Sequence, residues 1–356
     1  MTAPSPSSRR FVPALRRMAV LLALSGAAIA LGASTARAGD PIRVGYVSTS
    51  LASAPIVVAD GKGYFKGEGL DASLVGFESS DAIALAVASG DIDFGTTGIS
   101  NPFFVLGKAG SLKIIGGDTT EHAGFHSIGF IASNQAYAAG LKSMADAAGH
   151  SFGLTQIGSP LHYSLAAVLD KYKEDLKTVR VIALQSNSNV ASSLIGGQVD
   201  AAIMSSANLL AVINRNGGQR LSWLDDEMHY NVALTGTVAS TKLTESRPDT
   251  VRHFLAAFRK AAQAWDAVFV DGNDNRADQP GAPAMISLAA KSLNQPTAVI
   301  VAGLNYIEPE ARIAISDVQR MVDWYEKMGM QKSHIDAKSM VDLRYTKLFE
   351  RAADDN

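Results

Sequence analysis

The sequence predicts an α/β fold with two lobes and a helical C-terminal region. Short runs of β-branched and aromatic residues, typical of strands, alternate with apolar segments that begin at Ser, Pro or Asn, as helices do. One such series begins near residue 42 and a second begins near residue 127. From about residue 245 the pattern is mostly helical, and 356 residues are enough for two cores.

Composition excludes several classes of function. The chain has no cysteine, so it can form neither a disulfide nor a thiolate nucleophile or metal site. Its formal net charge of −2 gives no electrostatic reason to expect a nucleic-acid partner. The motifs G-x-S-x-G, GxxxxGK[ST] and H-E-x-x-H are absent. The sequence therefore favours a binding protein over an enzyme.

Residues 1–38 have the features of a secretory signal peptide. Arg9, Arg10, Arg16 and Arg17 precede an apolar stretch over residues 18–31, and Ala36-Arg37-Ala38 matches a cleavage site. The stretch is short for a membrane span, although an uncleaved anchor is the alternative. Without residues 1–38, 27 basic and 34 acidic side chains remain, a net charge of −7. We expect an acidic periplasmic protein, exported by either the Sec or the Tat route.

The first series predicts four strands with helices between them. Pro55 is suited to a first helical turn, and Ser79, Ser80 and Asp81 can cap a helix over 82–88. A further helix is expected near Pro102. The expected strands are 42–47, 70–77, 91–95 and 112–116.

The second series repeats this alternation. Helices are expected over 160–172 and 190–195, with another beginning at Ser205. The expected strands are 127–133, 151–154, 179–184, 200–204 and 231–239. Because helices separate most strands, we expect parallel pairing. Residues 86–95 also resemble residues 192–201, each with an Asp just before or at a strand, which favours two similar lobes.

Several motifs resemble one known group of proteins. Gly63, Phe65, Gly69 and Leu70 match G-x-F-x-x-x-G-L, although Ala72 stands where Val is usual. Gly90, Asp93 and Gly95, and the run from Gly197 to Ile203, also fit. Over roughly residues 40–330 the chain resembles the NitT/TauT group of ABC-transporter substrate-binding proteins.

The resemblance implies a type II periplasmic binding protein with a ligand cleft between two α/β lobes. The first lobe would comprise residues 39–126 and 236–356 with the C-terminal helices, and the second residues 127–235. The implied partners are a small-molecule ligand and an ABC permease in the inner membrane. We expect a monomer without a cofactor.

The cleft residues follow from the position of the strand ends. Ligands of open α/β sheets bind outside the carboxyl ends of the strands, where helix N-termini offer free N–H groups and partial positive charge. No Lys or Arg stands there, which favours a mono-anion, such as a sulfonate or a carboxylate, or a neutral ring. The candidate ligand-binding residues are Ser50, Ser53, Ser79, Ser80, Thr97, Ser100, Asn101, Ser159, His162, Tyr163, Ser186, Asn187, Ser205, Ser206, Asn208 and Thr235.

The sequence also allows two other interpretations. His122 and His126 with Glu121 have metal-ligating side chains, but such residues in a loop more often face solvent, and we expect no metal site. An enzyme on the same fold, resembling the thiamine-pyrimidine synthases, is the alternative function. Those enzymes use a cysteine-rich motif that this chain cannot contain.

Overall fold

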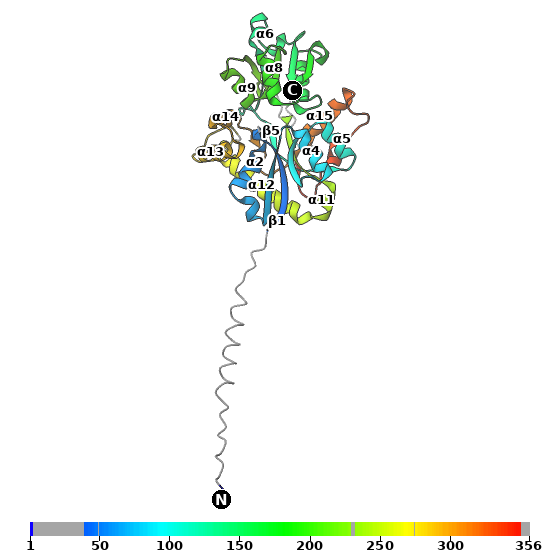
Figure 1. The fold of residues 1–356 in the computed structure, drawn as a ribbon. Coiled ribbons are helices and arrows are strands. Elements are labelled where there is room, and N and C mark those ends of the chain that lie inside the picture. Colours follow the sequence, from blue (N-terminus) through cyan, green and yellow to red (C-terminus); the bar gives the residue numbers. More distant parts are fainter. Residues whose placement is uncertain (3–38, 49, 229–231, 274, 350–356) are drawn as a thin grey trace. The chain divides into compact units, whose positions relative to one another are not determined.

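The computed structural model describes residues 1–2, 39–48, 50–228, 232–273 and 275–349. All but the first two residues of the predicted signal peptide therefore lie outside the described residues. From Gly39 onward the chain is one unit built on two five-stranded sheets (Figure 1). The architecture confirms the predicted α/β fold. Among the described helices, none combines the length and apolar character that crossing a membrane requires.

The first sheet has the strand order β2-β1-β3-β12-β4. Its strands are β1 (Asp40–Val47), β2 (Leu70–Phe77), β3 (Phe94–Gly98), β4 (Leu112–Gly117) and β12 (Thr235–Ser240). Strand β1 is parallel to β2 and β3, whereas β12 is antiparallel to β3 and β4. The expectation of parallel pairing is wrong for β12. This strand returns from the second sheet without a crossover helix, and so it enters from the opposite end.

The second sheet has the order β10-β6-β9-β7-β8. Its strands are β6 (Ile128–Ser133), β7 (Ser151–Leu154), β8 (Arg180–Ala183), β9 (Ala201–Ser205) and β10 (Gly218–Trp223). Strand β7 is parallel to β8 and β9. Strand β6 is antiparallel to β9 and β10, so the expectation of parallel pairing is wrong for β6 as well. Strand β10 was not predicted, because it lies at the sheet edge and its polar residues Gln219 and Arg220 are exposed.

Helices connect these strands, and serines cap several of them. Ser79, Ser100 and Ser159 accept hydrogen bonds from the N–H groups of Ala82, Phe103 and His162. The α-helices are α2 (Ala54–Gly61), α3 (Tyr64–Gly67), α4 (Ser80–Ser89), α5 (Asn101–Lys108), α6 (Asn134–Ala139), α7 (Pro160–Lys171), α8 (Asn187–Ile195), α9 (Ser206–Asn214) and α10 (Leu224–Glu227). The 3-10 helices are η1 (Leu51–Ser53), η2 (Met144–Asp146), η3 (Leu176–Thr178) and η4 (Ala337–Met340).

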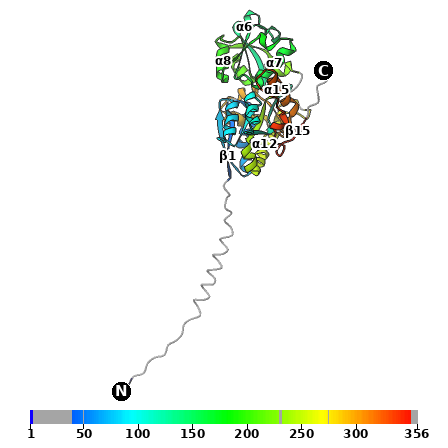
Figure 2. The same cartoon turned by 90° about the vertical axis from the view of Figure 1, so that its right-hand side faces the viewer.

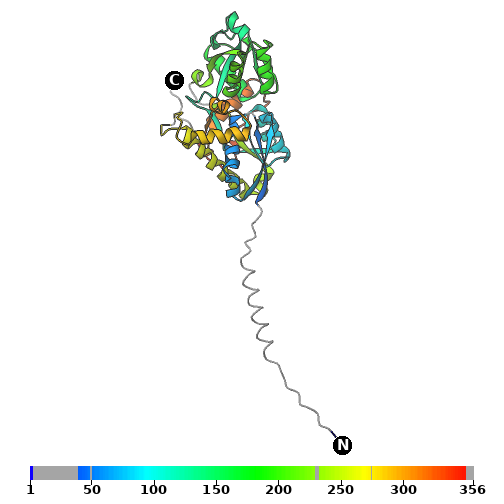
Figure 3. The same ribbon diagram turned by 60° about the vertical axis from the view of Figure 1, so that its left-hand side comes forward.

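The C-terminal part is mostly helical, as predicted. It contains α11 (Thr241–Ser246), α12 (Pro248–Phe269), α13 (Ala282–Leu293), α14 (Thr297–Ala302) and α15 (Ile315–Lys327), with the short strands β13 (Tyr306–Ile307), β14 (Ile313–Ala314) and β15 (Leu348–Phe349). Helices α12 and α13 pack against α2 (Figure 3). Helix α15 contacts both α5 and α7, and so bridges the two series of elements (Figure 2).

Aromatic residues fill the core between the first sheet and α12. The rings of Phe94 and Phe254 stack with centroids 4.0 Å apart, and Phe65 stacks on Phe254 at 5.7 Å. All three side chains are buried. Burial of such large apolar surfaces is the main force that fixes the C-terminal helices to the first sheet.

The chain passes between the two sheets at two places, and a small third sheet joins them. Its order is β11-β5-β13, with β5 (Thr119–Glu121) and β11 (Val232–Ala233) on the two crossings. Gly117 precedes the first crossing. A Cβ at this position would lie 2.0 Å from the carbonyl oxygen of Arg312, so only glycine fits without a backbone shift.

We predict that Gly117→Ala destabilises the protein by about 1–3 kcal/mol, the usual cost of overpacking, because the Arg312 backbone must move. Urea unfolding monitored by tryptophan fluorescence measures the change. Gly67→Ala is the matched control, since its added methyl group meets nothing within 4 Å. Equal stability of the two variants would show that the crossing tolerates displacement.

Candidate functional site

A cavity of about 160 Å³ lies where the carboxyl ends of strands from both sheets meet. Its lining is rich in hydroxyl groups and also includes the amides of Gln156, Asn187 and Asn305. Val47, Ile128, Leu161 and Leu234 supply apolar wall. The lining hydroxyls belong to Ser50, Ser53, Ser79, Ser80, Thr96, Thr119, Ser127, Thr155, Ser159, Ser205 and Thr235.

Half of the sixteen predicted binding residues line this cavity. They come from both series: the segments around the N-termini of α2, α4, α7 and α8, the end of β9 and the start of β12. These residues are Ser50, Ser53, Ser79, Ser80, Ser159, Asn187, Ser205 and Thr235. Contact between these residues and a ligand stays a prediction.

The other eight do not line the cavity: Thr97, Ser100, Asn101, His162, Tyr163, Ser186, Ser206 and Asn208. Most are engaged elsewhere. Thr97 Oγ1 donates to the carbonyl of Ser80 at 2.7 Å, and Ser100 both caps α5 and bonds to Asp81. Asn208 donates to Ser205 Oγ at 2.8 Å, and Ser206 is fully buried. Strand-end position alone does not reveal which hydroxyl points outward.

His162 and Tyr163 are candidate ligand-binding residues in the sequence, but both pack behind the cavity. Each makes an edge contact with the ring of Trp324 on α15, and both are buried. Nδ1 of His162 accepts the N–H of Gly158, so the ring proton lies on Nε2. Burial lowers the pKa of His162 to about 4, and the ring is therefore neutral at pH 7.

The electrostatics of the cavity come mainly from backbone groups. Residues at the N-termini of α2, α4, α7, α8 and α9 line it, and each of these helices has eight or more residues. Unpaired N–H groups and the helix dipole make such positions favourable for negative charge. Among the described residues of the lining, Glu78 alone carries an ionisable side chain, and it is exposed.

The prediction missed several lining residues. Ser127 and Thr155 stand next to predicted strands, so their position offered a signal. Asn305 lies between α14 and β13, far along the chain, and nothing in its local sequence indicates a place at the cleft.

Beside the cavity, one backbone hydrogen bond joins the half of the chain that carries the first sheet to the half that carries the second sheet. The N–H of Asn101, at the start of α5, donates to the carbonyl of Gly158 at 2.7 Å. Gly158 has a positive φ of 77°, and a Cβ there would lie 2.9 Å from the Cβ of Asn101. Glycine at position 158 therefore permits this close approach.

Two buried carboxyl groups stand directly behind the cavity wall. Oδ2 of Asp118 lies 2.8 Å from Oγ1 of Thr235, and a carboxyl oxygen of Glu121 lies 2.8 Å from Oγ of Ser127. Burial raises the pKa of Asp118 to about 8. Burial, together with the nearby Asp225 carboxylate, raises the pKa of Glu121 to about 8. Both carboxyl groups are mainly protonated at pH 7.

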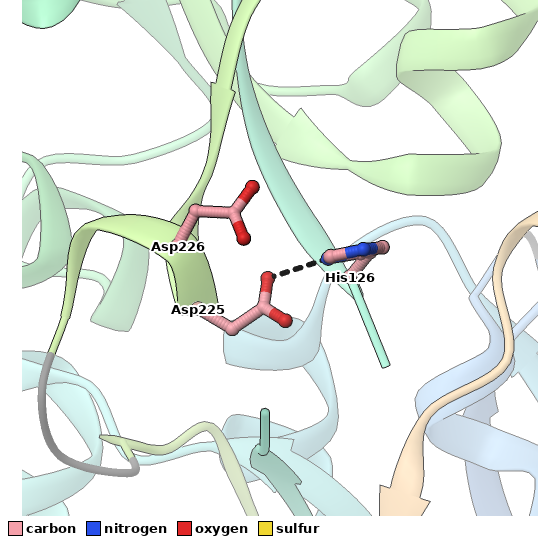
Figure 4. Close-up of side chains that lie close together, drawn as sticks. All are labelled: His126, Asp225 and Asp226. Carbon is pink, nitrogen blue, oxygen red and sulfur yellow. Dashed lines mark hydrogen bonds and ion pairs between the residues drawn. The ribbon is translucent and has the colours of Figure 1, made fainter. Parts of the chain in front are cut away.

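The histidines that suggested a metal site do not gather around Glu121. His122 stacks on Tyr306 with centroids 4.3 Å apart, and Glu121 faces Ser127. His126 instead lies beside Asp225 and Asp226 (Figure 4). Nδ1 of His126 is 2.9 Å from Oδ1 of Asp225. The other carboxylate oxygen of Asp225 accepts a hydrogen bond from the N–H of Gly124. These contacts hold the side chains of Asp225 and His126 in place.

The sequence model of a family described as NMT1/THI5 like matches residues 50–267. A protein of Brucella abortus (strain 2308) whose name describes it as a binding protein is 27% identical over 224 residues. These residues are 62% of this chain and 66% of that protein's length.

Solved structures of binding proteins are among those with a similar fold. The periplasmic aliphatic sulphonate binding protein SsuA from Escherichia coli is similar with a TM-score of 0.66 at 19% identity, covering 85% of this chain and 97% of that one. The periplasmic nitrate-binding protein NrtA from Synechocystis PCC 6803 has a TM-score of 0.63 at 14% identity, covering 85% of this chain and 84% of that one. At these identities the likeness concerns the fold.

We predict that the protein loses stability as pH rises from about 4 to 8. Asp118 and Glu121 keep their protons in the native state, whereas in the unfolded chain they ionise near pH 4. Each can lower the free energy of unfolding by at most about 1.4 kcal/mol per pH unit in this range. Denaturant unfolding between pH 5 and pH 9 measures it. The double variant Asp118→Asn/Glu121→Gln should show a flatter profile, and exposed Asp71→Asn should not.

Proposed function

The chain belongs to the NMT1/THI5-like family, and from this premise we propose that it is the periplasmic solute-binding component of an ABC importer. It captures a small mono-anionic organic ligand of sulfonate or aromatic carboxylate type and delivers it to the permease in the inner membrane. The observation that carries the proposal is the convergence of helix N-termini from both sheets on one hydroxyl-lined cavity.

The lining favours one negative charge. Hydroxyl, amide and backbone N–H groups can donate to an anionic group, whereas ligands with two or three charges usually recruit Arg. The described lining residues include no Lys, Arg or His. Glu78 at the cavity further disfavours additional negative charge on the ligand.

The size of the cavity narrows the ligand class. About 160 Å³ is below the usual range of roughly 300–1,000 Å³ for drug-sized ligands. We therefore favour the smaller sulfonates and carboxylates. The proposed ligand contacts include the eight predicted residues that line the cavity. The sulphonate- and nitrate-binding proteins that share the fold are named for mono-anionic ligands, in keeping with this choice.

We predict that Ser80→Phe and Ser205→Phe each weaken ligand binding at least a hundredfold, because the aromatic ring fills the cavity that both serines line. Calorimetry with ethanesulfonate, benzoate and nitrate identifies the ligand class and measures the loss. Cells that carry either variant as the only copy should take up that ligand more slowly.

Ser188→Phe is the matched control, since Ser188 lies in the first turn of α8, is exposed and does not line the cavity. It should bind as the parent does. Undiminished binding by both cavity variants would move the site elsewhere. Turnover of a bound probe would instead favour the enzyme alternative.

We predict export with cleavage near Ala38, because an arginine-rich start, a short apolar stretch and Ala36-Arg37-Ala38 precede the first strand. Mass spectrometry of the periplasmic fraction should find an N-terminus at or near Gly39. A full-length protein retained with membranes would contradict this part of the proposal.

A further inference from the structure

A short hydrogen-bonded chain links the cavity wall to a buried acid. Thr119 on β5 and Thr235 on β12 both line the cavity. Their Oγ1 atoms are 2.6 Å apart, and the N–H of Thr119 donates to Thr235 Oγ1 at 3.1 Å. Behind them Asp118 Oδ2 lies 2.8 Å from Thr235 Oγ1. Asp118 is 2% exposed, and its Oδ1 has no hydrogen-bond partner within the described part of the chain.

The number of hydrogens on these groups decides the direction in which each hydrogen bond of the series is donated. An ionised carboxylate only accepts, so Thr235 must then donate to Asp118 and Thr119 must donate to Thr235. Thr119 is left with lone pairs toward the cavity. When Oδ2 of Asp118 holds a proton, it donates to Thr235, and Thr235 donates to Thr119. The hydrogen of Thr119 is then free to point at a ligand. One proton on Asp118 thus converts the Thr119 hydroxyl from an acceptor into a donor.

The charged groups around Asp118 do not compensate a negative charge on it. Glu308 and Arg312 share a cavity of about 20 Å³ with Asp118. They pair with each other, with Arg312 Nε 2.6 Å from Glu308 Oε1. Glu121, three residues further along the chain on β5, faces Ser127 and Asp225. An ionised Asp118 would therefore repel an anion across the Thr235 side chain. Burial raises the pKa of Asp118 to about 8, which keeps the proton in place at pH 7.

We infer that Asp118 is a positioning residue of the ligand site, and that capture of an anion requires the protonated form of this buried carboxyl. The inference rests on the proposed function, and it adds a direct coupling between ligand affinity and pH. Asp118 touches no ligand in this arrangement. It acts through the hydroxyl groups of Thr235 and Thr119, which it sets as donors.

The test compares the pH dependence of binding in two proteins. Calorimetry uses whichever of ethanesulfonate, benzoate or nitrate binds the wild type most tightly at pH 7, and Kd is measured at pH 7 and at pH 9. The rise in Kd should be about tenfold larger for the wild type than for Asp118→Asn. The asparagine amide donates at every pH, as the protonated acid does. Since both proteins retain Glu121, the comparison isolates Asp118.

Each outcome is decisive. Equal rises in Kd for wild type and Asp118→Asn overturn the inference and leave the proposed function intact. Failure of every probe to bind the wild type at pH 7 overturns the proposed ligand class, and with it the inference. Asp71→Asn, an exposed change, should keep the wild-type ratio. If Asp118→Asn does not fold, the smaller neutral variant Asp118→Ser gives the same comparison.

Discussion

The pairing of β5 with β11 is the interaction on which the geometry of the cavity depends. Both crossings between the sheets enter this small sheet, where Val232 pairs with Glu121 and Ala233 with Thr120. The N–H of Leu234 then donates to the carbonyl of Thr119 at 3.0 Å. This register brings residues that are 116 positions apart in sequence into contact at the wall. A slip of one residue would turn the side chains of one crossing to the opposite face.

The crossing that contains β5 also explains why the cavity lining carries so little formal charge. Asp118 and Glu121 lie in a part of the chain that is closed to solvent, so their neutral forms are favoured. Hydroxyl groups and helix N-termini are left to interact with a ligand. Such neutral donors lose little solvation energy when they enter a closed site, and this suits a protein that must both bind and release its cargo.

Local signals in the sequence predicted much of the fold. The resemblance between residues 86–95 and 192–201 corresponds to a shared contact, because Asp93 accepts the N–H of Arg43 on β1 and Asp200 accepts the N–H of Ser151 on β7. In each half the acid precedes a central strand and fixes it to the first parallel strand. Cap serines likewise marked helix starts correctly at Ser79 and Ser159. These features depend on a few neighbouring residues.

What the sequence did not reveal depends on contacts between distant segments. The direction of β12 follows from its path between the sheets, and the burial of His162 follows from packing against Trp324. Asp118 looks like an ordinary turn residue until the small sheet and the Glu308–Arg312 pair enclose it. Half of the predicted site residues do not line the cavity, and several are held elsewhere by contacts with other segments: Thr97 donates to the Ser80 carbonyl and Ser100 to the Asp81 carboxylate.

The hydrogen bond from Asn101 to Gly158 has a consequence for how this protein can diverge. The contact joins two backbone groups, so at position 101 any residue except proline can supply the donor. Glycine is required only on the accepting side, where φ is positive. Evolution can therefore change the side chain at position 101 while the backbone contact between α5 and the Gly158 loop is inherited unchanged.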